Sequence, residues 1–192
     1  DNVLLNSWKN LQYHDPADIL KDYRGIELSG MLERVKEPRA RTLRTNKQKP
    51  LREGRDAALF CYGLSVAVLG TKVIFSMSEE SDYDFVLCYK DNEDTINYAP
   101  VQLKEVIFSR SDINGEIKKL TKYPDSNNLV VALKLNGRGK FVPSDIKVPQ
   151  NLAIGELWVY GSLNQEQTRW FIYGDVLKTP DFFHYAYPTL VK

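Results

Sequence analysis

The chain has 192 residues, of which 43% are hydrophobic and 27% are charged. A chain of this size and composition can bury a hydrophobic core, which excludes a wholly disordered protein. Two cysteines cannot form a disulfide framework, and the longest uncharged stretch, 57–71, is too short to span a bilayer.

The formal net charge of +1 conceals an uneven distribution. Segment 34–55 contains nine basic and two acidic residues, a net charge of +7, so the remainder of the chain carries −6. A basic segment of this density often contacts polyanions, although a solvated linker can have the same composition. We predict nucleic-acid contacts for seven of its side chains: Arg39, Arg41, Arg44, Lys47, Lys49, Arg52 and Arg55.

Two regions are expected from the order of patterns along the chain. Residues 1–50 should form a helical or irregular N-terminal arm that contains the first part of the basic segment. Within it, Asp15 and Pro16 are typical of the cap and first position of a short helix. Residues 51–192 should form one α/β domain.

The α/β domain begins with a helix predicted over 51–69, where apolar residues recur at three- and four-residue spacing. A second helix is predicted over 109–122, capped by Ser111 or Asp112. Strands are predicted at 71–77, 84–90, 100–108, 129–135, 156–160 and 169–173. This alternation predicts a mixed β-sheet flanked by helices, with a helix-strand-strand-strand-helix-strand core followed by extra C-terminal strands.

A group of polar residues falls at particular places in this order. Asp84 begins the second predicted strand, and Gln102 and Lys104 share a face of the third because side chains alternate along a strand. If these strands pair as a hairpin, Asp84 lies beside Gln102 and Lys104. Glu53, in the first turn of the first helix, reaches the same end of the sheet if that helix packs across it.

These residue types can form a divalent-metal site. Mg²⁺, or Mn²⁺ in its place, prefers oxygen ligands and needs only one or two protein carboxylates. Asp84 would supply a carboxylate, Gln102 its side-chain carbonyl and Leu103 its backbone carbonyl. Lys104 would hold or help to deprotonate an attacking water.

The arrangement resembles the PD-(D/E)XK nuclease superfamily, which has the restriction-endonuclease-like fold. That family places an acid on the second strand and (D/E)XK on the third, and often has a Glu in the first helix. Here Tyr83-Asp84 stands in place of Pro-Asp, and Gln102-Leu103-Lys104 stands in place of (D/E)XK. The matching part of the chain is 51–135.

The resemblance implies a role for each matching residue. Asp84 would bind the metal, Lys104 would be catalytic, and Glu53 would be an accessory ligand to the metal or water. Gln102 replaces an acid, which weakens the metal-binding charge. This Gln-X-Lys form looks like that of methylation-dependent restriction enzymes and of some transposase endonuclease subunits.

We therefore predict a metal-dependent nuclease that hydrolyses phosphodiester bonds in DNA with a metal-activated water. The substitution at Gln102 motivates a second hypothesis, a non-catalytic nucleic-acid-binding or assembly module on the same fold. A third is a protein-interaction domain whose basic arm contacts an acidic partner. Asp82 and Asp56 compete with Asp84 and Glu53 for the acidic roles, and Glu105 is expected to face away from the site.

The remaining expectations concern partners and location. The aromatic-rich C-terminal end should form core or an interface between two copies of the chain, as in a homodimer. No secretory signal opens the sequence, and we expect a soluble cytoplasmic protein that does not bind membranes.

Overall fold

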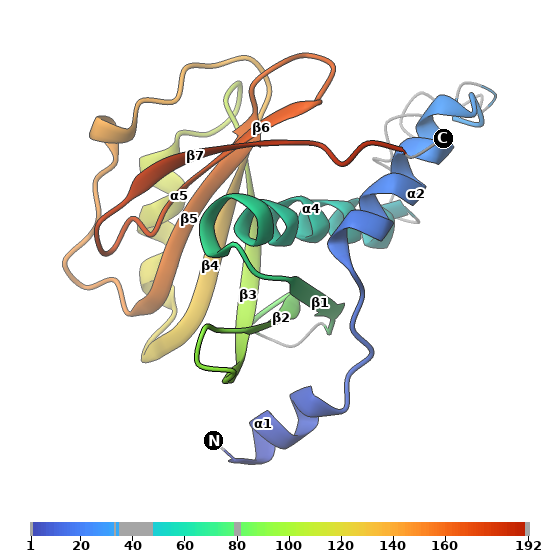
Figure 1. Ribbon diagram of the computed structural model, residues 1–192. Coiled ribbons are helices and arrows are strands. Elements are labelled where there is room, and N and C mark those ends of the chain that lie inside the picture. Colours follow the sequence, from blue (N-terminus) through green and yellow to red (C-terminus); the bar gives the residue numbers. More distant parts are fainter. Residues whose placement is uncertain (1, 33, 35–47, 79–81, 191–192) are drawn as a thin grey trace.

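The computed structural model describes residues 2–32, 34, 48–78 and 82–190, which form one sheet with helices on both faces (Figure 1). The helices are α1 (Asn2–Lys9), α2 (Pro16–Leu28), α4 (Lys49–Gly63) and α5 (Ile113–Lys119). A π-helix over Leu64–Leu69 continues α4, a 3-10 turn over Leu120–Lys122 continues α5, and a further 3-10 turn covers Pro143–Asp145. The strands are β1 (Val73–Met77), β2 (Phe85–Lys90), β3 (Ile96–Ile107), β4 (Ser126–Asn136), β5 (Ile154–Ser162), β6 (Arg169–Gly174) and β7 (Asp181–Ala186).

The seven strands follow one another across the sheet in the order of the sequence. β3 pairs parallel with β4, and β4 pairs parallel with β5, whereas the pairings at both ends of the sheet are antiparallel. Each parallel pairing needs a long connection, and α5 lies in the connection between β3 and β4. The prediction of an α/β fold with a mixed sheet flanked by helices is confirmed.

Most of the predicted elements are present with small changes at their ends. The predicted helix over 51–69 corresponds to α4 and its π-helical continuation, which ends at Gly70 with a φ of +63°. The second predicted helix starts later, at Ile113, because Asp112 caps it by accepting a hydrogen bond from Gly115 N at 2.9 Å. The sequence patterns missed β7, whose residues alternate less clearly between apolar and polar.

Hydrophobic side chains fill both faces of the sheet. On one face, α2 and α4 cover a core that includes Leu20, Phe60 and Val101. On the other face, α5 covers a second core that includes Ile117 and Leu133. Because both faces are covered, polar side chains on the central strands reach solvent only where the sheet ends or a strand runs past its neighbour.

The N-terminal region contributes to the first core. Asp15 caps α2 as predicted, accepting a hydrogen bond from Ala17 N at 2.9 Å. Leu20 of α2 is fully buried, so part of segment 1–50 packs with the α/β domain. At the other end of the chain, Trp170 is 2% exposed, so at least part of the aromatic-rich region belongs to the core. No helix within the described ranges is long and apolar enough to cross a membrane.

Candidate functional site

Asp84 lies directly before β2, at the point where β3 runs past the start of that strand. β2 pairs with β3 only as far as Val101, so β3 runs past its neighbour from Gln102 onward. Asp84 N donates a hydrogen bond to Val101 O at 2.8 Å. The Asp84 carboxylate then accepts a hydrogen bond from Leu103 N at 2.7 Å. It replaces the backbone carbonyl that a longer β2 would offer to β3. The predicted hairpin of β2 and β3 is therefore formed, and it fixes Asp84 against β3.

Gln102 is buried beside Asp84. Its side-chain amide Nε2 donates to Asp84 Oδ2 and also to the backbone carbonyl oxygen of Leu103, at 3.3 Å in the second case. Its Oε1 accepts a hydrogen bond of 3.4 Å from the Tyr123 hydroxyl. Only 7% of Gln102 is exposed, so its side chain does not lie on a solvent-facing side of the hairpin.

These residues border a pocket of about 240 Å³, which we call the Asp84 pocket. Its walls come from α4, from the end of β2, and from the neighbouring strands β3, β4 and β5. All five residues predicted for the catalytic and metal site line it: Glu53, Asp84, Gln102, Leu103 and Lys104. The other lining residues are Lys49, Arg52, Asp56, Glu105, Lys134 and Tyr160. The structure thus brings the five predicted site residues to one pocket, although Glu53 and Lys104 are 51 positions apart in the sequence.

The inner wall of the pocket is a buried ion pair that sequence reasoning missed. Lys134 Nζ lies 2.6 Å from Asp56 Oδ1, and only 6% of Lys134 is exposed. Burial lowers the pKa of Lys134, because a charged ammonium is costly in a low-dielectric environment, and the nearby Asp56 carboxylate opposes this effect. Arg55 Nε lies 3.4 Å from the same oxygen, and Tyr160 OH donates to Asp56 O at 3.0 Å.

The acidic alternatives named from the sequence lie in different places. Asp56, the competitor of Glu53, is in the pocket but is held by Lys134. Asp82, the competitor of Asp84, is exposed and does not line the pocket. Glu105 lies on the opposite face of β3 from Gln102 and Lys104, as expected, yet it lines the pocket and accepts a hydrogen bond from Asn136 Nδ2 at 2.6 Å.

Two of the three predicted ligand oxygens face one point in the pocket, whereas the third, Gln102 Oε1, faces the Tyr123 hydroxyl, contrary to the prediction. Two of the proposed ligand oxygens, Asp84 Oδ2 and the Leu103 carbonyl, converge on one hydrogen-bond donor, the amide Nε2 of Gln102. Oxygens that converge on a partial positive charge can also converge on a cation. No three Asp, Glu, His or Cys side chains among the described residues form a ready-made metal cluster. Mg²⁺ needs fewer protein carboxylates than that.

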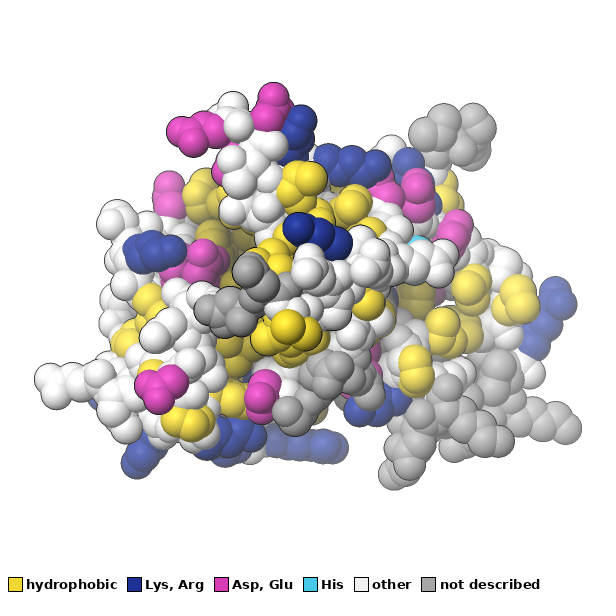
Figure 2. Space-filling view, turned by 90° about the horizontal axis from the view of Figure 1, so that it is seen from below, with side chains coloured by type: hydrophobic (Ala, Val, Ile, Leu, Met, Phe, Trp, Pro, Cys, Tyr) yellow, Lys and Arg dark blue, Asp and Glu magenta, His cyan; other side chains and the backbone are white. Residues whose placement is uncertain are grey.

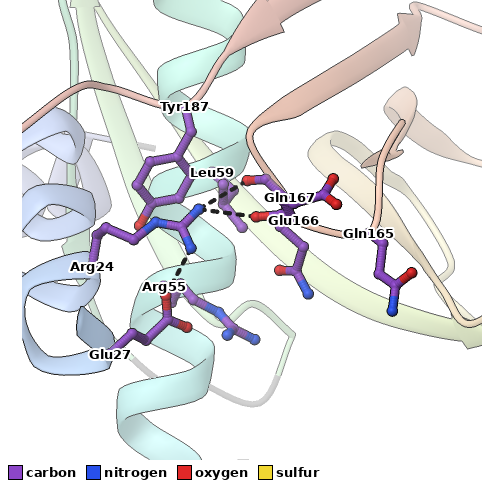
Figure 3. Close-up of a pocket in the computed structure, with 8 residues that line it drawn as sticks. All are labelled: Arg24, Glu27, Arg55, Leu59, Gln165, Glu166, Gln167 and Tyr187. Atoms are coloured by element: carbon purple, nitrogen blue, oxygen red, sulfur yellow. Dashed lines mark hydrogen bonds and ion pairs between the residues drawn. The ribbon is translucent and has the colours of Figure 1, made fainter. Parts of the chain in front are cut away.

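The predicted basic contacts divide into three groups. Lys49 and Arg52 line the Asp84 pocket, and Lys49 also lies 3.3 Å from Glu53. Arg55 lies deeper, with 16% of its side chain exposed, and lines a second pocket between α2, α4 and the 165–167 loop (Figure 3). Four others lie outside the described residues: Arg39, Arg41, Arg44 and Lys47.

The face shown in Figure 2, seen from below Figure 1, has a different character. Acidic, basic and hydrophobic side chains are interspersed on it, among the residues that are drawn in colour. A surface that binds a polyanion usually gathers basic side chains on one face or stripe. This view therefore does not favour the lower face as the nucleic-acid surface.

Comparisons with known proteins do not assign the chain to a family. No family model matches the sequence, and neither the curated proteins nor the solved structures searched contain a match.

Proposed function

We propose that the protein is a metal-dependent nuclease that hydrolyses phosphodiester bonds in DNA, on a restriction-endonuclease-like variant of the α/β fold. The observation that carries this proposal is the convergence of Glu53, Asp84 and the Gln102–Lys104 stretch of β3 on one pocket. The order of α4, β1, β2, β3, α5 and β4 also matches the core order of that fold. Lys49 and Arg52 add positive charge at the same pocket, where a phosphate would enter.

Each side chain has a separate role in this proposal. Asp84 would hold Mg²⁺ or Mn²⁺ together with the Leu103 carbonyl, and Glu53 would be an accessory ligand. Gln102 would bind the ion through Oε1 once its side-chain amide turns from the orientation in which Nε2 faces Asp84. A bound divalent cation lowers the pKa of its water and stabilises charge on the phosphate. Lys104 would position the attacking water and offset negative charge as the phosphorus–oxygen bond breaks. Leu103 N fixes the Asp84 carboxylate before substrate binds, because it donates to that group at 2.7 Å.

The substitution at Gln102 supports a second candidate, a nucleic-acid-binding module without catalysis. In the structure Gln102 satisfies Asp84 by donating a hydrogen bond, as a purely structural amide would do. Under this reading the Asp84 pocket stabilises the end of β2, and Lys49 and Arg52 bind the phosphate backbone. DNA binding would then survive Asp84→Ala and would not depend on metal.

The test is cleavage of end-labelled DNA in Mg²⁺ or Mn²⁺, with EDTA as the blank. We expect metal-dependent cleavage by the wild-type chain and a loss of at least about 100-fold in Asp84→Ala and Lys104→Ala, because each removes a group that stabilises the transition state. Asp82→Ala is the matched control, since Asp82 is an exposed carboxylate two residues from Asp84. Thermal unfolding would verify that each variant is folded.

Two results would contradict the nuclease proposal. One is full cleavage by both Asp84→Ala and Lys104→Ala, which would show that the Asp84 pocket is not the active site. The other is DNA binding by the wild-type chain without cleavage in either metal, which would favour the non-catalytic module.

A further inference from the structure

A third pocket, with a polar lining, lies further along β4 than the Asp84 pocket, and no step of the proposed reaction uses it. It has a volume of about 340 Å³ and lies at the carboxyl ends of the parallel strands β4 and β5. Its polar lining consists mainly of amides and one guanidinium, from Asn136, Arg138, Ser162, Asn164, Gln165 and Gln167. We call it the amide pocket.

The two pockets are connected through β4 and β3. Lys134 lines the Asp84 pocket, and Asn136, two residues further along the same face of β4, lines the amide pocket. Asn136 Nδ2 donates at 2.6 Å to Glu105, which also belongs to the Asp84 pocket. A chain molecule with one phosphate beside Asp84 and Leu103 would follow β3 for about four residues, roughly 13 Å, to reach the level of Asn136 at the amide pocket.

The loop that forms one wall is held rigidly in place. Asn164 Oδ1 accepts hydrogen bonds from Thr168 N and Arg169 N, both at 3.0 Å. From α2, Arg24 donates to the carbonyl oxygens of Glu166 and Gln167, at 3.3 and 3.2 Å (Figure 3). These bonds fix the backbone of the loop, so its side chains project from a defined position.

Two side chains of the amide pocket remain available for a ligand. Arg138 and Gln165 are exposed, and neither makes a hydrogen bond or ion pair with another of the described residues. Figure 3 shows Gln165 apart from the hydrogen-bonded group around Arg24. Gly137, with a φ of +88°, turns the chain directly after β4 and places Arg138 beyond the strand end.

The chemistry of this lining suits a nucleobase better than a phosphate. An amide offers a donor and an acceptor side by side, and a guanidinium offers a fork of donors, which are the groups that read base edges. A phosphate site would instead need several positive charges, whereas Arg138 is the one charged residue that lines this pocket in the described chain. The volume is within the range of small-molecule sites.

We propose that the amide pocket binds an unpaired base of the polynucleotide substrate, a short distance along the chain from the phosphate held in the Asp84 pocket, and so determines base preference. This inference rests on the proposed function for the position of the phosphate. It goes further by assigning Arg138 and Gln165 as specificity-determining residues.

The test is equilibrium binding without catalysis. Fluorescein-labelled single-stranded oligo(dA), oligo(dC) and oligo(dT) would be titrated with the protein in EDTA at low salt, and anisotropy recorded. We expect the wild-type chain to prefer one base. Arg138→Ala and Gln165→Ala should each weaken binding of that oligonucleotide by about tenfold, as for loss of a base contact. Arg110→Ala and Gln150→Ala are matched controls, because both residues are exposed and line neither pocket.

The outcomes separate this inference from the nuclease proposal. Equal binding of all three oligonucleotides by the wild-type chain, or variants that match their controls, would overturn the inference. A wild-type base preference that is lost in Arg138→Ala and Gln165→Ala would support it even if no metal promotes cleavage, a result that would refute only the nuclease. An absence of binding at low salt would overturn this inference alone, because the nuclease proposal is tested separately by cleavage in the presence of metal.

Discussion

The Asp84 pocket and the amide pocket share one strand and differ in charge. Lys134 and Asn136 are two residues apart on β4, yet the first belongs to a pocket rich in carboxylates and cations and the second to a pocket rich in neutral amides. Charged groups can stabilise a changing charge distribution, which a reaction requires. Neutral amides discriminate between hydrogen-bonding patterns at little electrostatic cost. The difference agrees with the two proposals, which place chemistry in one pocket and base recognition in the other.

The largest effect on stability should come from replacing Lys134, the buried partner of Asp56 in the Asp84 pocket. We expect Lys134→Met to reduce the free energy of unfolding by about 3 kcal/mol, because it leaves the buried carboxylate of Asp56 without its closest partner. The double variant Lys134→Met/Asp56→Leu should recover most of this loss. Urea unfolding of both variants would measure it. Losses that simply add would show that the two side chains are not coupled.

Adding one carboxylate to each pocket in turn tests whether only the Asp84 pocket binds metal. Gln102→Glu places a second carboxylate beside Asp84, so we expect about a tenfold gain in apparent affinity for Mn²⁺ or Mg²⁺. Gln165→Glu adds the same charge to the amide pocket and should leave metal affinity unchanged. The rise in unfolding temperature with metal concentration reports both affinities. Equal responses of the two variants would remove the distinction between the pockets.

The smallest effect comes from a carboxylate outside both pockets, Asp15, which provides a reference. Burial acts to raise its pKa, but the Lys72 ammonium at 2.9 Å and the Ala17 N–H hold the pKa below its ordinary value. Its contribution to stability is therefore present above about pH 4, the ordinary value for Asp, and is lost as the pH falls through the lower pKa of the folded state.

We expect Asp15→Ala to lower the free energy of unfolding by about 1 kcal/mol at neutral pH, the usual cost of losing a helix cap. The difference from wild type should shrink at acid pH. Urea unfolding at several pH values would measure this, and a difference that does not depend on pH would mean that the charge of Asp15 is not responsible.

The sequence was most informative where a local pattern fixes a local structure. The apolar spacing predicted α4, and the alternation in β3 with the turn after β2 predicted that Asp84 lies beside Gln102. Asp15 was recognised as a helix cap because that geometry depends on only a few adjacent residues.

The sequence was least informative about partners that only tertiary packing brings together. The pair of Asp56 and Lys134 joins residues 78 positions apart, and neither residue predicts the other. A lysine inside the otherwise apolar stretch 129–135 was a signal that a buried partner was needed. Alternation put Glu105 on the correct face of β3, but it did not show that side chains from both faces reach one pocket where β3 runs past β2.

The nuclease proposal requires a divalent cation in the Asp84 pocket. An anomalous difference map from a crystal of the wild-type chain soaked in Mn²⁺, compared with a soaked crystal of Asp84→Ala, would locate this ion. We predict a peak in the Asp84 pocket, within direct bonding distance of the Asp84 carboxylate, in the wild-type crystal alone. A wild-type map with no peak in this pocket, or a peak that persists in Asp84→Ala, would contradict the proposal.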